Sequence, residues 1–141
     1  MQLSNIVDIA VSGIAAQRAR MTVTASNLAN AESTRSADGG PYRRRDPVFE
    51  ARPLDPFASR MDRKLRTVQL TRIAEDGRDP IRRHDPSHPD ADAAGFVAYP
   101  NVNVVEEMAN MISASRSFEA NLVLLGKARR MGEAALRIGR S

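Results

Sequence analysis

All eight prolines of this 141-residue chain lie between Pro41 and Pro100, and neither end of the sequence contains one. Because proline ends or kinks a helix, this distribution divides the chain into three parts. We expect a helical segment at 1–34, a proline-rich region of loops and a β-hairpin at 35–100, and a second helical segment at 101–141. The expected fold is therefore mainly α, with a small irregular β middle.

The N-terminal segment has apolar residues at intervals of seven. Asn5 is a suitable N-cap and Asn30 a suitable left-handed end residue, so the pattern predicts a helix over 5–30. A strict seven-residue repeat is typical of a coiled-coil seam. Its main column consists of Val7, Ile14, Met21 and Leu28, and Gln17 interrupts a partner column of Leu3, Ala10, Thr24 and Ala31.

The C-terminal segment has the stronger start signal, because Asn103 and Glu106 form a capping-box pair after a proline. The predicted helix, 103–138, is roughly 54 Å long, so part of it should project or be covered by another subunit. Its predicted seam is Val104, Met108, Met111, Ser115, Phe118, Leu122 and Leu125, followed by a stammer to Ala128. We expect the two helices to be close to antiparallel, with the column of Val7, Ile14, Met21 and Leu28 against that of Val104, Met111, Phe118 and Leu125.

The middle of the chain has short strand signals. Alternation at 67–71 predicts a half-buried strand, 75–77 is a turn signal, and 47–50 and 96–99 are further candidate strands. The segment 50–64 gives no clear signal. The clusters Arg43–Arg45 and Arg82–Arg83 should be exposed, because this polar setting offers no partners for adjacent buried guanidinium groups.

Composition argues against most catalytic chemistry. The chain has no cysteine, and His84 and His88, although four residues apart, are separated by proline, so we expect a turn-rich loop rather than a metal site. Glu106 and Glu107 are interpreted as a helix N-terminal charge pair. We expect no enzyme, no catalytic residue, no metal and no cofactor.

The sequence also lacks membrane and secretion signals. No run of about eighteen apolar residues occurs, so we expect no membrane span. Polar residues such as Asp8 and Gln17 interrupt the N-terminal apolar pattern, so we expect no cleaved signal peptide.

Two motifs carry a resemblance to a known family. The first is Ala25-Ser26-Asn27-Leu28-Ala29-Asn30, and the second extends from Pro100-Asn101-Val102-Asn103 to Phe118-Glu119-Ala120-Asn121. Both resemble the terminal motifs of the bacterial flagellar axial (rod and hook) proteins. Stretches 39–43 and 88–97 are similar to a proximal rod member of that family. The resemblance covers 8–49 and 66–138 and departs from the family at 50–64.

The resemblance implies a structural subunit of the proximal rod of the bacterial flagellar basal body. Family members pair their terminal helices as a coiled coil and stack into a helical tubular shaft. That shaft crosses the periplasm, transmits torque for motility and contains the export channel. The implied partners are copies of the chain, neighbouring proximal and distal rod proteins, and the flagellar type III export apparatus, which secretes rod subunits without a cleaved signal peptide.

From the two seams and these motifs we predict an assembly interface. It comprises Val7, Ile14, Met21, Ser26, Asn27, Leu28, Asn30, Val104, Met108, Met111, Phe118, Asn121, Leu122 and Leu125.

The net charge of +4 and pI of about 10.3 leave an alternative open. A basic, homo-oligomeric coiled-coil protein that binds nucleic acid would show an affinity that falls steeply with salt. A small enzyme would instead need a pocket with convergent polar groups.

Overall fold

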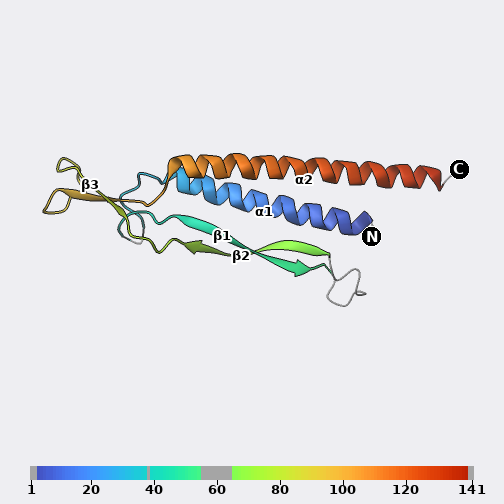
Figure 1. Ribbon diagram of the computed structural model, residues 1–141, viewed down its shortest axis with the longest axis horizontal. Coiled ribbons are helices and arrows are strands. Elements are labelled where there is room, and N and C mark those ends of the chain that lie inside the picture. The colour runs from blue at the N-terminus through green and yellow to red at the C-terminus, as the bar shows by residue number, and fades with distance from the viewer. Residues whose placement is uncertain (1–2, 38, 55–64, 140–141) are drawn as a thin grey trace.

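The computed structural model describes residues 3–37, 39–54 and 65–139. In chain order the elements are α1 (Leu3–Ala29), β1 (Arg45–Pro53), β2 (Arg66–Glu75), β3 (Ile81–His84), β4 (Phe96–Tyr99) and α2 (Val104–Ile138). Figure 1 shows α1 between α2 and the ribbon of β1 and β2, with β3 and β4 beyond the end where α2 begins. The expected mainly α fold, with paired terminal helices and a small β middle, is confirmed.

The two helices run antiparallel, as three contacts along their length show. Leu3 lies so close to Gly132 that a Cβ there would be 2.8 Å from Leu3 Cδ2. Midway, a Cβ at Gly13 would be 2.9 Å from Asn121 Nδ2. At the other end the Asn27 side chain donates to Glu107 over 3.1 Å. Small residues therefore allow the helix backbones to approach closely.

The helix ends differ in how well their caps were predicted. Asn103 caps α2 as expected, because its side chain accepts hydrogen bonds from the amides of Val105 and Glu106. The predicted N-cap Asn5 is wrong, because α1 already includes Leu3, whose contact with Gly132 stabilises an earlier turn. Asn30 has no positive φ, so its predicted left-handed conformation is also wrong.

The strands β1 and β2 pair antiparallel from Arg45 with Glu75 to Pro53 with Arg66, and a bulge interrupts the register between Val48 and Phe49. Both strands contain the predicted segments. The expected half-burial of β2 is wrong, however, because the apolar residues Val68, Leu70 and Ile73 are exposed in this chain. The unassigned segment 50–64 overlaps the end of β1, and its residues 55–64 lie outside the described part of the chain.

The second hairpin pairs β3 with β4, from Ile81 with Tyr99 to His84 with Phe96. Strand β4 was predicted and β3 was not. Side chains in the connecting loop cap backbone amides as expected: His88 Nδ1 accepts from Asp90 N, and Asp92 accepts from Ala94 N and Phe96 N. These amides lower the pKa of the Asp92 carboxyl. Arg82 and Arg83 are exposed, as predicted, and lie over the Phe96 and Tyr99 rings.

Candidate functional site

Asn27, in the last turns of α1, occupies the centre of a buried polar junction with α2 and the loop before β1. Its Nδ2 donates to Glu107 Oε2 and to the Arg45 carbonyl, at 3.1 and 2.8 Å. Its Oδ1 accepts from Tyr42 OH and from Arg45 N, both at 2.9 Å. A carboxamide has four such positions, and all four are used. Asn27 therefore fixes three separate segments relative to one another.

Glu107 completes this junction from the first turn of α2, where it is 1% exposed. Arg44 approaches the same carboxylate from the loop, with Nε 2.8 Å and Nη2 2.7 Å from Glu107 Oε1. Burial opposes the charge on Arg44, but the hydrogen bonds to Glu107 and Asp46 outweigh it and raise the pKa of this guanidinium. Glu107 is thus half of a buried ion pair, as well as a favourable charge at the helix N-terminus.

This pair corrects two expectations. Arg44 was expected to be exposed with the rest of its cluster, but its side chain is only 10% exposed. Glu107 was interpreted only as a charge at the helix start. Sequence reasoning missed this ion pair because the two residues are far apart in the chain. A usable signal was Glu107 itself, a charged residue in the same helical column as the apolar residues Ala114 and Ala128.

Two other residues of the predicted motif, Ser26 and Asn30, form hydrogen bonds that stabilise the turn after α1. Asn30 Nδ2 donates to the Ser26 carbonyl at 2.9 Å, and Ser33 Oγ donates to Asn30 Oδ1 at 3.1 Å. Ser26 Oγ lies 3.3 Å from Tyr42 OH. The motif at 25–30 therefore organises the corner from which the chain leaves the helical pair.

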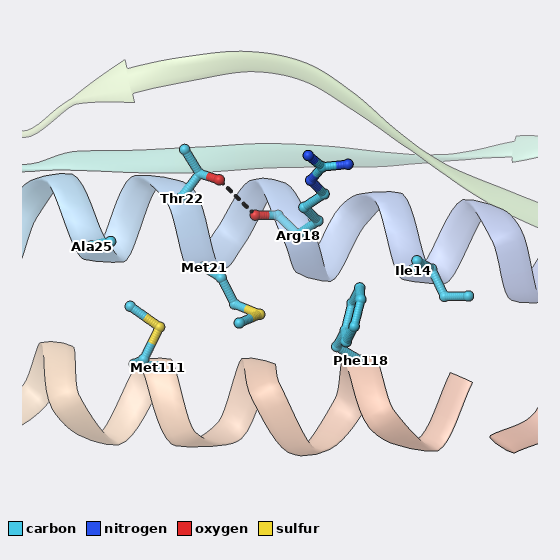
Figure 2. Close-up of a pocket in the computed structure, with 7 residues that line it drawn as sticks. All are labelled: Ile14, Arg18, Met21, Thr22, Ala25, Met111 and Phe118. Carbon is cyan, nitrogen blue, oxygen red and sulfur yellow. Dashed lines mark hydrogen bonds between the residues drawn. The ribbon is translucent and has the colours of Figure 1, made fainter. Parts of the chain in front are cut away.

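The predicted helix columns are brought together only in part. Figure 2 shows Ile14 and Met21 of α1 facing Phe118 and Met111 of α2 across a groove. Val7 shares a second groove with Leu125, and Leu28 is half-buried.

Three residues of the predicted α2 seam are largely exposed. Val104, Met108 and Leu122 are 43%, 52% and 45% exposed, so this column is not buried against α1, although Leu122 lines the same groove as Val7. Its place is taken by a column of Glu107, Ala114, Asn121 and Ala128. With Met111, Phe118, Leu125 and Gly132, this column keeps the 4-3 spacing throughout, so the predicted stammer is wrong.

Several grooves open along the helical pair. The groove drawn in Figure 2 has a volume of about 460 Å³, and Arg18, Thr22 and Ala25 also line it. A groove of about 510 Å³ lies between α1 and β2, where Leu70 and Ile73 form its far wall. A third, of about 550 Å³, is lined by Val7, Leu122, Leu125, Gly126 and Arg129.

Large apolar side chains continue around the outside of α2. Val105, Ile112 and Val123 are all more than half exposed. Exposed apolar surface of this extent marks a site of contact with another molecule. Within the described residues no three potential metal ligands gather, and neither helix has the length and apolar character needed to cross a membrane.

Comparisons with known proteins agree with this geometry. One family model, "Flagella basal body rod protein", matches residues 8–35, and another, "Flagellar basal body rod FlgEFG protein C-terminal", matches residues 93–138. The matched segments cover most of α1 and all of α2.

Curated relatives match along most of their length. The flagellar basal-body rod protein FlgC of Salmonella typhimurium is 41% identical over 139 residues, which cover 99% of each chain. The FlgC proteins of Borreliella burgdorferi and Aquifex aeolicus are 38% and 44% identical, covering 98% and 86% of each chain. These matches give no support to the nucleic-acid alternative. With two rod-protein segments on the paired helices and relatives of this similarity over nearly the whole sequence, the chain belongs to the FlgC family of flagellar basal-body rod proteins.

Proposed function

We propose that this chain joins its neighbours in the rod through the exposed apolar surface of its helical pair. As a member of the FlgC family, it is a structural subunit of the proximal rod of the flagellar basal body. The observation that carries the proposal is the set of large apolar side chains on α2 that remain about half exposed in this chain, including Met108, Ile112, Leu122 and Val123. A catalytic activity is not part of this proposal.

The proposed interface keeps all the residues predicted from the sequence and gives them two roles. Val104, Met108 and Leu122 are exposed and contact neighbouring subunits directly. The remaining residues shape the surface from within the helical pair or its corner: Val7, Ile14, Met21, Ser26, Asn27, Leu28, Asn30, Met111, Phe118, Asn121 and Leu125. In the same way we retain 1–34 and 101–141 as the axial segments of the subunit and 35–100 as its outer part.

The proposal includes the place of the subunit in the cell. The rod forms part of a drive shaft across the periplasm and encloses the export channel, and both are needed for motility. The partners are further copies of this chain and adjacent rod proteins. The flagellar type III apparatus exports the subunit without a cleaved signal peptide. An exposed apolar surface that is buried only on assembly agrees with this route.

The test is Leu122→Asp, expressed in a motile bacterium in place of the native subunit. Leu122 is 45% exposed, so the isolated chain should unfold at nearly its normal temperature. In the rod the new carboxylate would be buried without a partner, at a cost of several kcal/mol. We expect the variant to be exported, rods to stop at this subunit and cells not to swim. Lys127→Asp is the matched control, because it places the same carboxylate at another exposed position of α2.

Secreted subunit, isolated basal bodies and swimming are followed together in both strains. Normal rods and normal swimming in Leu122→Asp would contradict the proposed interface. If the isolated variant instead lost its thermal unfolding transition, Leu122 would belong to the core of its own chain.

A further inference from the structure

We propose that Pro47 and Pro53 close the outer edge of β1, so that the ribbons of two copies of this chain cannot pair strand to strand. The inference concerns the β1–β2 ribbon and is independent of the helical surface that carries the proposed function. A two-stranded ribbon has two edges, and each edge carries backbone amides and carbonyls that the ladder leaves unpaired. In this chain α1 covers one part of these edges, and proline interrupts the rest.

Two hydrogen bonds at the ends of the ribbon identify the backbone groups that point outward. Asp76 N donates to the Arg44 carbonyl at 2.7 Å, and Leu54 N donates to the Leu65 carbonyl at 3.0 Å. In an antiparallel pair every second residue bonds to the other strand, and the residues between them point away from it. Counted from either end through the observed register, the residues of β1 that face outward are 45, 47, 49, 51 and 53.

Side chains of α1 agree with this assignment and cover part of both edges. Asn27 binds the outward amide and carbonyl of Arg45, at 2.9 and 2.8 Å. Ser12 Oγ accepts a hydrogen bond at 3.2 Å from the amide of Val68, which pairs with an outward residue of β1. The two strands cross in Figure 1, so α1 meets the edge of β1 near one end of the ribbon and the edge of β2 further along.

More of the β2 edge also lies beside α1. Leu70 and Ile73 of β2 line a groove together with residues of α1. Beyond the crossing of the strands in Figure 1, β1 lies on the side of β2 that is away from α1. The long stretch of edge that α1 leaves uncovered is therefore that of β1 after Arg45.

Both prolines of β1 occupy outward positions on this uncovered edge. Proline has no amide hydrogen to offer a partner strand, which is why it is tolerated at the edges of sheets. Between Pro47 and Pro53 only Phe49 and Ala51 keep outward amides, and no hydrogen bond among the described residues uses either one. An edge about 20 Å long thus offers a partner strand only two amides.

The side chains of this edge would otherwise favour pairing with a copy. Glu50 and Arg52 lie on one face of β1, with 3.6 Å between their charged atoms. Antiparallel pairing of two β1 strands about Ala51 would set Glu50 of each copy beside Arg52 of the other, which is a favourable cross-strand pair. In that register Phe49 would lie opposite Pro53, whose missing amide removes one hydrogen bond on each side. The prolines therefore oppose a contact that the side chains alone would permit.

Amide hydrogen exchange of the purified chain tests the closed edge. In the natural chain the amides of Phe49 and Ala51 should exchange freely, whereas that of Glu50, which faces β2, should be protected. The double variant Pro47→Thr/Pro53→Thr has four outward amides in a row on this edge. Copies should then pair, and exchange at Phe49 and Ala51 should slow by about tenfold or more.

A matched control removes two prolines elsewhere. Pro86 and Pro89 are exposed in the loop between β3 and β4, outside the ribbon. The double variant Pro86→Thr/Pro89→Thr should leave exchange at Phe49 and Ala51 as fast as in the natural chain.

A single thiol tests the register of the pairing. The chain has no cysteine, so Ala51→Cys introduces one thiol at the centre of the expected contact. Residues that exchange both hydrogen bonds have Cα atoms about 5.5 Å apart, which is within the range of a disulfide. Oxidation should therefore give a covalent dimer in the Pro47→Thr/Pro53→Thr background and little dimer with the natural prolines. Ala93→Cys, exposed in the loop before β4, measures dimers that form by random collision.

Three results would overturn the proposal. The first is fast exchange at Phe49 and Ala51 in the Pro47→Thr/Pro53→Thr variant, with no more dimer than Ala93→Cys gives. The second is protection of the same two amides, or an equal yield of dimer, in the chain with its natural prolines.

The third result applies if the double variant loses its ribbon, which fast exchange at Glu50 would reveal. The single variants Pro47→Thr and Pro53→Thr then take its place, and an unprotected Ala51 amide in both would overturn the proposal. None of these measurements involves the rod, so the proposed function is tested separately by Leu122→Asp.

Discussion

The seam between α1 and α2 and the outer surface of α2 are built from opposite kinds of residue. The most buried apolar side chains of the seam are alanines, Ala10, Ala114 and Ala128. Outside, large residues such as Ile112 and Leu136 are exposed. In a chain that completes its core alone the larger side chains would be inside. This subunit therefore uses small residues for its own helix pair and leaves much of its strongest apolar surface uncovered.

The energetic consequence follows from side-chain size. Burying a large aliphatic side chain stabilises by about 1.5–3 kcal/mol, and an alanine contributes far less. The seam consequently depends on close backbone approach and on the polar junction around Asn27 and Glu107 to define one arrangement. The outer surface retains a large hydrophobic contribution that is gained only on contact with another molecule.

The largest effect is expected at the polar junction around Asn27 and Glu107, which belongs to the seam and not to the outer surface. Glu107→Ala removes the buried partner of Arg44 and one acceptor of Asn27, and we expect a loss of about 3 kcal/mol in the free energy of unfolding. Chemical denaturation of the purified chain measures it. Glu106→Ala, next to it and exposed, is the matched control and should change stability by less than about 0.5 kcal/mol. Equal effects of the two variants would show that the junction does not hold the helices.

The close approach of the helices gives a second, smaller effect. In Gly13→Val the new side chain would collide with Asn121, because even a Cβ would lie 2.9 Å from its amide nitrogen. Over-packing of this kind should cost about 2 kcal/mol. Gly126→Val is the control, since no heavy atom lies within 4 Å of a Cβ at Gly126. Thermal unfolding should therefore separate the two variants, and similar melting temperatures would argue against close packing at Gly13.

The smallest effect concerns the ion pair between Asp76 and Arg78, just after β2. Hydrogen bonds from Arg78 lower the pKa of the Asp76 carboxyl to about 2, from an ordinary value of 3.8. Because the folded-state pKa is depressed, its contribution to stability is present above pH 3.8 and is lost as the pH falls toward 2. Carboxyl chemical shifts measured by NMR should follow this titration. Arg78→Ala should return the pKa toward 3.8 with little change in unfolding, and an unchanged pKa would contradict the assignment.

Much of the fold could be predicted because its signals are local. Proline placement separated the two helices from the middle, and Asn103 marked the start of α2 because its side chain acts on amides two and three residues away. Strand β4 was predicted from four consecutive residues, whereas β3 was hidden within an arginine cluster.

The side of α2 that faces α1 could not be predicted in the same way. Periodicity weighs residues by hydrophobicity, so it selected Met108 and Leu122 over Ala114 and Asn121. The residues of α2 that face α1 are instead those small enough to let Gly13 and its neighbours on α1 come close. Arg44 and Glu107 were missed for a related reason, since an ion pair between residues 63 positions apart leaves no local pattern.

The antiparallel pairing also determines the order in which the chain can reach its native state. Contacts of α1 with α2 join residues far apart in the chain: Asn27 and Glu107 are 80 positions apart, and Leu3 and Gly132 are 129 apart. Such non-local contacts require a large loop to close before they add stability, which slows folding. Until α2 is available, α1 can pack only against the loop and strands that follow it, and the side that α2 covers remains able to pair with another chain.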